Sequence, residues 1–320
     1  MGLASLARLL CYLFCGLLLG LTASGRSLRR DRIAFTASQS QQNSQIVTMS
    51  LDGLEARWLT RTPTAQTLTA NMDPAWSPDG RWIAFIAEQQ DQVNLYVMDA
   101  NGTNLTQLTH GGGLKLFPTW SPDSRSIAYM SNQEGSHDLY VVDVATRQSY
   151  RLTRSEGLEV APTWSPDGRF ITFVSDRDGN YELYNLPVQG NLPLAVDQPI
   201  RLTNHPAVDT SPSWSPDSRW LAFISDRDNP NGVNSIYLLN VSTNQLVRLT
   251  DASSDCAAPT WSADGRLLAI TQRIRRPDGR WGLSQIVIMT PDGKERDRLT
   301  DWQQIPETYP SWGLSKIPKD

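Results

Sequence analysis

Six tryptophans occur within similar short sequences, and acidic residues that could act in catalysis or binding precede several of them. Five positions before these tryptophans stand an amide, a lysine, a thiol and three carboxylates: Asn71, Lys115, Glu159, Asp209, Cys256 and Glu307, with Asp73 and Asp255 close by. Carboxylates held about 5–10 Å apart can hydrolyse a glycosidic bond. If the fold brings these acidic side chains together at one edge, they can also bind a cation or a basic partner. The candidate binding residues here are Lys115, Glu159, Asp209, Asp255 and Glu307.

A second candidate site is basic and aromatic, and it lies in the long connection at 271–282. Its residues are Arg273, Arg275, Arg276 and Trp281, with Arg280 beside them. Arginine and tryptophan are typical anchors of protein interfaces. The connection therefore predicts a docking site, and a solvated hairpin tip is the alternative.

Metal and serine-hydrolase chemistry receive little support. The histidines are His110, His137 and His205, in separate loops. His110 and His205 both follow a Leu-Thr pair and could share one rim as binding residues, but two imidazoles lack a third metal ligand. The loops at 175–180 and 225–229 alternate aspartates without the downstream glutamate of a calcium loop, which favours turns with a local Asp–Arg pair. No Gly-x-Ser-x-Gly motif occurs. We expect no cofactor, with calcium as the minor alternative.

These residues must be positioned by a repeat. The recurring tryptophans are Trp76, Trp120, Trp164, Trp214, Trp261 and Trp312. A complete copy carries a short strand ending in tryptophan, a turn that reads Ser-Pro-Asp in four copies and Ser-Ala-Asp at 262–264, an apolar strand, a polar loop, another apolar strand and a final Leu-Thr or its equivalent. This pattern predicts four strands per copy. Because the tryptophan is present in every copy, we interpret it as a structural core residue and not as a ligand platform.

The two ends of the chain complete each other. Residues 33–35 read Ile-Ala-Phe, as residues 83–85 do, but no tryptophan strand precedes them, and Trp312 has no Ile-Ala-Phe after it. We expect 309–313 to be the innermost strand of the blade formed by 32–37, 45–50 and 55–60. The predicted fold is an all-β, six-bladed β-propeller closed by its C-terminal strand.

The motifs Pro-x-Trp-Ser-Pro-Asp, Ser-Asp-Arg-Asp and Leu-Tyr-Val-Met-Asp resemble the TolB-type propeller repeat over about residues 30–313. The resemblance implies a periplasmic binding protein, although similar blades also serve prolyl oligopeptidases and polysaccharide lyases. Oligogalacturonate lyases use a histidine-rich metal cluster, which three histidines cannot supply. We expect the N-terminal α/β domain of TolB to be absent, so its contact with the inner-membrane partner is not carried over.

The remaining composition concerns location and partners. We expect residues 1–25 to be a signal peptide or an uncleaved membrane anchor, 26–313 to be the propeller and 314–320 a tail. Four arginines after the apolar run of the leader argue against translocation by the positive-inside rule, but its length and small-residue ending favour export. A net charge of −4 and the lack of a basic run in the repeats argue against nucleic acid. We expect a monomer outside the cytoplasm with no membrane domain beyond the leader.

Two functions follow as hypotheses. The first is a non-enzymatic, exported propeller that binds a protein or envelope component through its loops. The alternative is a carbohydrate-binding or carbohydrate-active protein in which Glu159, Asp209 and Glu307 supply the carboxylates.

Overall fold

The computed structural model describes residues 31–40, 43–51, 53, 55–60, 68–188, 199–229, 232–276, 278–294, 296–299 and 307–314. The expected leader at 1–25 and the tail beyond residue 314 lie outside these ranges. Regular structure within them consists of β-strands. A search of the same residues for a helix long and apolar enough to cross a bilayer finds none.

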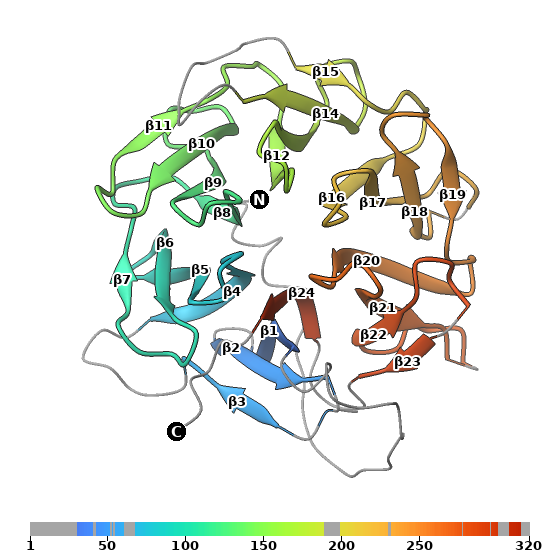
Figure 1. Ribbon diagram of the computed structural model, residues 1–320, viewed down its shortest axis with the longest axis horizontal. Helices are drawn as coiled ribbons and strands as arrows, with labels where there is room; N and C mark the ends of the chain where they lie inside the picture. Colours follow the sequence, from blue (N-terminus) through green and yellow to red (C-terminus); the bar gives the residue numbers. More distant parts are fainter. Residues whose placement is uncertain are drawn as a thin grey trace.

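Six four-stranded antiparallel sheets stand around one axis, as Figure 1 shows. From the axis outwards, the first comprises β24 (Glu307–Leu314), β1 (Asp31–Ser40), β2 (Asn43–Ser50) and β3 (Ala56–Trp58), and the second β4 (Thr69–Trp76), β5 (Trp82–Gln89), β6 (Gln92–Asp99) and β7 (Thr106–Gln107). The third comprises β8 (Lys115–Trp120), β9 (Ser126–Ser131), β10 (Asp138–Asp143) and β11 (Ser149–Arg151), and the fourth β12 (Glu159–Trp164), β13 (Phe170–Ser175), β14 (Glu182–Pro187) and β15 (Ile200–Arg201). The fifth comprises β16 (Asp209–Trp214), β17 (Trp220–Ser225), β18 (Ser235–Asn240) and β19 (Leu246–Arg248), and the sixth β20 (Ser254–Trp261), β21 (Leu268–Ile274), β22 (Gln285–Met289) and β23 (Arg296–Arg298).

The ring closes as the sequence predicts. β24, the last strand, pairs antiparallel with β1, the first, and Ile33 lies opposite Trp312. At the next boundary Gly313 lies against the indole of Trp76, where an added Cβ would come within 2.1 Å of Trp76 Cδ2. The six-bladed, all-β prediction is therefore confirmed.

The Ser-Pro-Asp turn between the first and second strands is held by its own side chains. In the fourth sheet Ser165 Oγ donates to Asp167 Oδ1 at 2.7 Å and accepts the backbone N–H of Phe170 at 2.9 Å. Asp167 Oδ1 also accepts the backbone N–H of Arg169 at 3.1 Å. Gly168 has a φ of 75°, which glycine adopts without steric cost. These bonds explain why this tetrapeptide turns the chain back.

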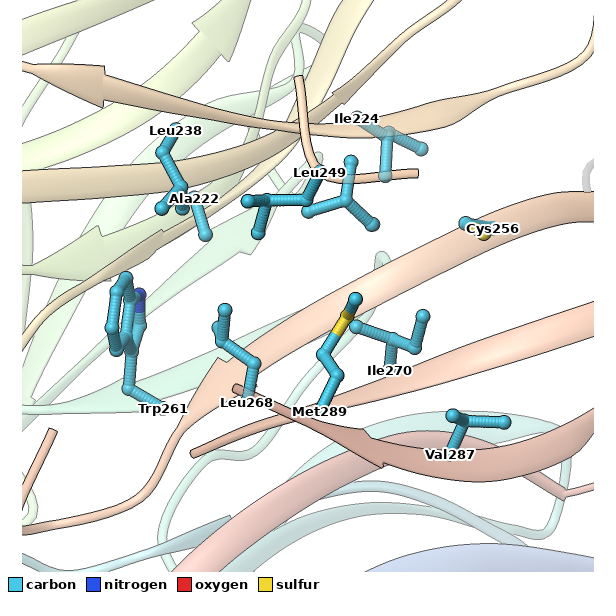
Figure 2. Packing of buried hydrophobic residues seen from close by; sticks show 11 residues of the cluster. Ala222, Ile224, Leu238, Leu249, Cys256, Trp261, Leu268, Ile270, Val287 and Met289 are labelled. Carbon is cyan, nitrogen blue, oxygen red and sulfur yellow. The ribbon is translucent and has the colours of Figure 1, made fainter. Parts of the chain in front are cut away.

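The apolar core lies between neighbouring sheets. Figure 2 shows the boundary between the fifth and sixth sheets, where Ala222 and Leu238 of one pack with Trp261 and Leu268 of the next. All six repeat tryptophans are buried, with relative exposures of 5–9%. The indole N–H of Trp261 donates to the carbonyl oxygen of Ser213, on the inner strand of the preceding sheet, at 3.2 Å. The tryptophan thus joins two blades.

The Leu-Thr pair at the end of each copy has a bonding role. Thr203 Oγ1 accepts the backbone N–H of Leu183, the second residue of β14, at 3.0 Å. The same bond recurs from Thr60, Thr109, Thr153 and Thr250, at 2.8–3.0 Å. Each threonine fixes the point at which the chain leaves one blade for the inner strand of the next.

Candidate functional site

The loops that lead into the inner strands lie on the same face as the loops that join the second and third strands of each sheet. The register places Glu159 opposite Ser175, and Asp209 opposite Ser225. We call this side of the ring the loop face. The opposite side, which carries the Ser-Pro-Asp turns, is the turn face.

Glu159 and Asp209 begin β12 and β16, and their side chains are fully buried. Each is paired with an arginine of its own sheet. Arg177 Nη2 bonds Glu159 Oε1, and Arg227 Nη2 donates to Asp209 Oδ2 at 2.6 Å. The expectation that these arginines pair with aspartates of their own loops is wrong, because the strand register places the start of each loop beside the inner-strand carboxylate.

The guanidinium groups are also held by aromatic rings. The Arg227 guanidinium lies 5.4 Å from the ring centroid of Phe223 and 5.2 Å from that of Tyr237. Arg177 sits in the same way over Phe173 and Tyr184. Such cation–π contacts stabilise a desolvated arginine. The arginine of the Ser-Asp-Arg-Asp loop is therefore a fixed part of the blade.

Burial raises the pKa of both carboxyl groups, even though each has an arginine beside it. Hydrogen bonds from Thr153 to Glu159 and from Ser225 to Asp209 act in the opposite direction and lower these pKa values, but the effect of burial is larger. A further carboxylate lies across each blade boundary, with Asp138 raising the pKa of Glu159 and Glu182 raising that of Asp209. These side chains have no solvent contact through which a substrate could reach them.

Lys115 begins β8 and is likewise buried, with a relative exposure of 1%. Its Nζ donates to the carbonyl oxygens of Gly111 at 2.9 Å and Gly112 at 2.6 Å, and also to that of Gly113. Burial lowers the pKa of the ammonium group. Lys115 therefore fastens the loop before its own strand and does not present a free charge.

The two rim histidines are not brought together in a metal site. His110 is exposed in the loop before β8. His205 lies before β16, where its backbone N–H donates to Glu182 Oε1 at 2.6 Å and its Nδ1 accepts the N–H of Ala207 at 3.1 Å. Among the described residues, no group of three histidine, cysteine, aspartate or glutamate side chains is arranged to hold a metal ion.

The basic connection forms a hairpin between β21 and β22. Arg273 forms an ion pair with Asp255. The ring centroid of Trp281 is 5.7 Å from the guanidinium carbon of Arg273 and 4.9 Å from that of Arg275. Arg275 and Arg276 are exposed. Glu307 begins β24 on the same face, opposite Ala37, and its side chain lies outside the described residues.

Sequence reasoning missed a bend in every inner strand. Three residues before each repeat tryptophan the backbone has a positive φ, between 46° and 58°, at Asp73, Phe117, Ala161, Ser211, Ala258 and Tyr309. The pairing with the second strand shifts register at these positions. The signal common to all six was the fixed distance from tryptophan, because only Asp73 is of a residue type that favours this conformation.

This bend brings one titratable pair into the inner wall of the ring. Burial raises the pKa of Asp73 to about 6, against the opposing effect of a backbone hydrogen bond from Phe117. Partial desolvation of a side chain that stays 45% exposed, together with the charge of Asp73, raises the pKa of Tyr309 to about 12. Asp73 and Tyr309 thus lie close enough to interact on neighbouring inner strands.

Solved structures with the same architecture include TolB from Acinetobacter baumannii, with a TM-score of 0.72 and 23% identity over 90% of this chain and 67% of that one. An oligogalacturonate lyase in complex with manganese aligns with a TM-score of 0.55 and 18% identity over 84% of this chain and 72% of the lyase. At these identities the likeness shows the fold alone.

Sequence comparisons reach further. The "uncharacterized peptidase YuxL" of Bacillus subtilis (strain 168) is 33% identical over 79 residues, which are 24% of this chain and 12% of YuxL. The match therefore spans a small part of YuxL. The family model described as the TolB beta propeller domain matches residues 23–197 and 191–313, most of the chain. The chain belongs to the TolB beta propeller domain family.

Proposed function

We propose that this chain is a non-enzymatic, exported propeller that binds a protein or cell-envelope component through its loop face. The observation that carries the proposal is the arginine pairing of Glu159 and Asp209, which leaves these candidate acids buried and engaged inside the blades. A glycosidase needs two carboxylates that flank a bound substrate. The burial of this pair therefore weighs against the carbohydrate-active alternative and favours recognition by exposed side chains.

The variation between blades supports the choice of face. The turn face repeats the same Ser-Pro-Asp chemistry, with a serine-to-aspartate bond of 2.5–2.7 Å in five sheets. On the loop face the exposed residues of the loops between the second and third strands differ, with Gln133 and Glu134 in the third sheet, Asp178 in the fourth, and Arg275 and Arg276 in the sixth. A specific partner is recognised by differences between blades, and these lie on the loop face.

Export is part of the same proposal and rests on the apolar leader at 9–21. It places the propeller outside the cytoplasm as a monomer, free or held by an uncleaved leader. Fractionation of cells that produce the full chain, with mass determination of the recovered protein, tests both location and cleavage. Recovery of the intact chain in the cytoplasm would contradict it.

Site-specific photo-crosslinking tests the binding face. We would place a photoreactive residue at Gln133 or Glu156, which are exposed on the loop face, and in matched proteins at Thr146 or Thr243, which are exposed on the turn face. The expected result is one shared crosslinked partner from the loop-face positions and none from the turn-face positions. Equal crosslinking from both faces would overturn the proposal.

A further inference from the structure

The hairpin between β21 and β22 is longer than its counterparts. Its last ladder pair is Gln272 with Gln285, which leaves a connection of residues 273–284, whereas in the fourth sheet Ser175 pairs with Glu182 and leaves only 176–181. The additional residues form a two-stranded ribbon. The N–H of Gly282 donates to the carbonyl oxygen of Ile274 at 2.9 Å, and the N–H of Arg276 to that of Arg280 at 2.8 Å. The ribbon is therefore a built extension of the sixth blade at the loop face.

The side chains on one side of the ribbon contact one another and the rest of the blade. Arg275 forms a bridge with Trp281, so the two lie directly opposite each other, and Arg273 is on the same side because side chains alternate along a strand. The ring of Trp281 contacts the guanidinium groups of both Arg273 and Arg275, and Arg273 also bonds Asp255. This side anchors the ribbon to the blade.

The other side carries charge with no internal partner. Alternation places Ile274, Arg276 and Arg280 on it, and Arg276 and Arg280 lie opposite each other. Like charges that face each other across a strand pair repel. Within the described part of the chain no ion pair joins either guanidinium to a carboxylate, and Asp278 is used in the turn, where it accepts the backbone N–H of Arg280 at 3.0 Å.

The neighbouring blades show that this arrangement is unusual on the loop face. Five of their arginines pair with carboxylates of the chain, at Arg151, Arg177, Arg201, Arg227 and Arg248. Arg154, in the loop before β12, is exposed without an ion pair among the described residues, but it is a single charge and not a facing pair. Ile274 beside the free pair is 42% exposed, which is large for an isoleucine. The ribbon therefore presents two unpaired guanidinium groups and an exposed apolar side chain on an ordered backbone. This composition is typical of an interface that binds an anionic partner.

We infer that the Ile274, Arg276 and Arg280 side of this ribbon is a docking site for an acidic segment of a protein partner that also carries an apolar residue. The inference rests on the proposed function and names the chemistry of its partner. A bilayer is the weaker fit, because polybasic membrane segments use about four to eight basic residues. The ribbon has only three arginines without a carboxylate partner, which are Arg275, Arg276 and Arg280.

A defined acidic peptide tests the inference without knowledge of the natural partner. The probe is a short fluorescent peptide of alternating glutamate and leucine, with the glutamine-and-leucine peptide as its uncharged match, and binding is read by fluorescence anisotropy. The test protein is Arg276→Glu/Arg280→Glu. Its control is Arg57→Glu/Arg147→Glu, which makes the same change in net charge at exposed sites away from the ribbon.

We expect the glutamate peptide to bind wild type and the control, with at least a tenfold weaker affinity for the ribbon variant and for the glutamine peptide. Equal loss in both variants, or no loss in the ribbon variant, overturns the inference. Binding of anionic phospholipid vesicles that needs Arg276 and Arg280, without peptide binding, also overturns it. Unfolding of each variant is followed by circular dichroism, and Ile274→Ser, which keeps both charges, gives a second reading through an expected loss of several-fold. If the loop face crosslinks a partner while the ribbon variant binds normally, the proposed function stands and this inference fails.

Discussion

Removing the guanidinium group of Arg227 measures how far the blades depend on their buried ion pairs. The Asp209 side chain is fully buried and the Arg227 side chain is 13% exposed, so Arg227→Met leaves a carboxylate in the interior with no counter-charge. Breaking a buried pair from one side costs about 3–5 kcal/mol. Methionine keeps much of the packing against Phe223 and Tyr237, so the loss reports mainly on charge. We expect the free energy of unfolding at neutral pH to fall by that amount.

The double variant Asp209→Asn/Arg227→Met separates charge from shape. Without the buried carboxylate charge, most of the lost stability should return. Asp209→Asn alone leaves the Arg227 guanidinium without its carboxylate and should also lower stability, but less than Arg227→Met, because that guanidinium is partly exposed and keeps its contacts with two aromatic rings. In Arg227→Met that pKa rises further. Stability is then present at acidic pH, where the carboxyl is protonated, and is lost as the pH rises through the raised pKa.

Urea unfolding followed by tryptophan fluorescence, over a series of pH values, is the assay for all three proteins. The control is Arg219→Met, because Arg219 lies 4.0 Å from Asp217 and its side chain is 76% exposed, so it should change stability by less than about 0.5 kcal/mol. A loss below about 1 kcal/mol in Arg227→Met, or a double variant as unstable as Arg227→Met, would refute the reasoning.

Variants at three further positions test other parts of the ring. Gly313→Ala should lower the midpoint of thermal unfolding by several degrees, because its Cβ would lie 2.1 Å from Trp76 Cδ2, and an unchanged midpoint would contradict this contact. Thr203→Val should cost about 1–3 kcal/mol in urea unfolding, because the buried N–H of Leu183 loses its acceptor, whereas Thr203→Ser should keep most of the stability. Asp73 has a pKa of about 6 against an ordinary 3.8, so its contribution is full below about pH 4 and is lost as the pH rises through 6, by at most about 3 kcal/mol. Asp73→Asn should remove that loss between about pH 4 and pH 8, and parallel stability profiles for the two proteins would exclude it.

The fold could be predicted from sequence because its information is local and repeated. A turn such as 165–168 carries its own hydrogen bonds, and the strand that lacks a tryptophan before Ile33 matches the one that ends with Trp312. The same order of strands and turns recurs in each copy, so an ambiguous strand assignment in one copy can be resolved by comparison with the others. The closure follows from counting strands.

The candidate site was harder to predict because it depends on contacts between segments that are distant in the sequence. The sequence places Glu159 at the head of an inner strand, but only the register of β12 with β13 shows that Arg177 reaches it. Lys115 looks like a free charge until the glycine carbonyls around its Nζ are seen. The bend at Ala161 depends on packing around the axis and has no preference in the residue type. Pairings between segments decide which charges are used internally.

The pairing of β24 with β1 closes the ring between the first and the last strands that the structure describes. A ribosome delivers β1 before every other strand that the structure describes, and its inner partner β24 after all of them. Until then β1 keeps an unpaired edge, which is the kind of edge that invites aggregation or capture by a chaperone. A chain cut before residue 307 would keep five complete sheets and expose this edge, so the sheet of β1 is completed only after the strands of the other five sheets have been made.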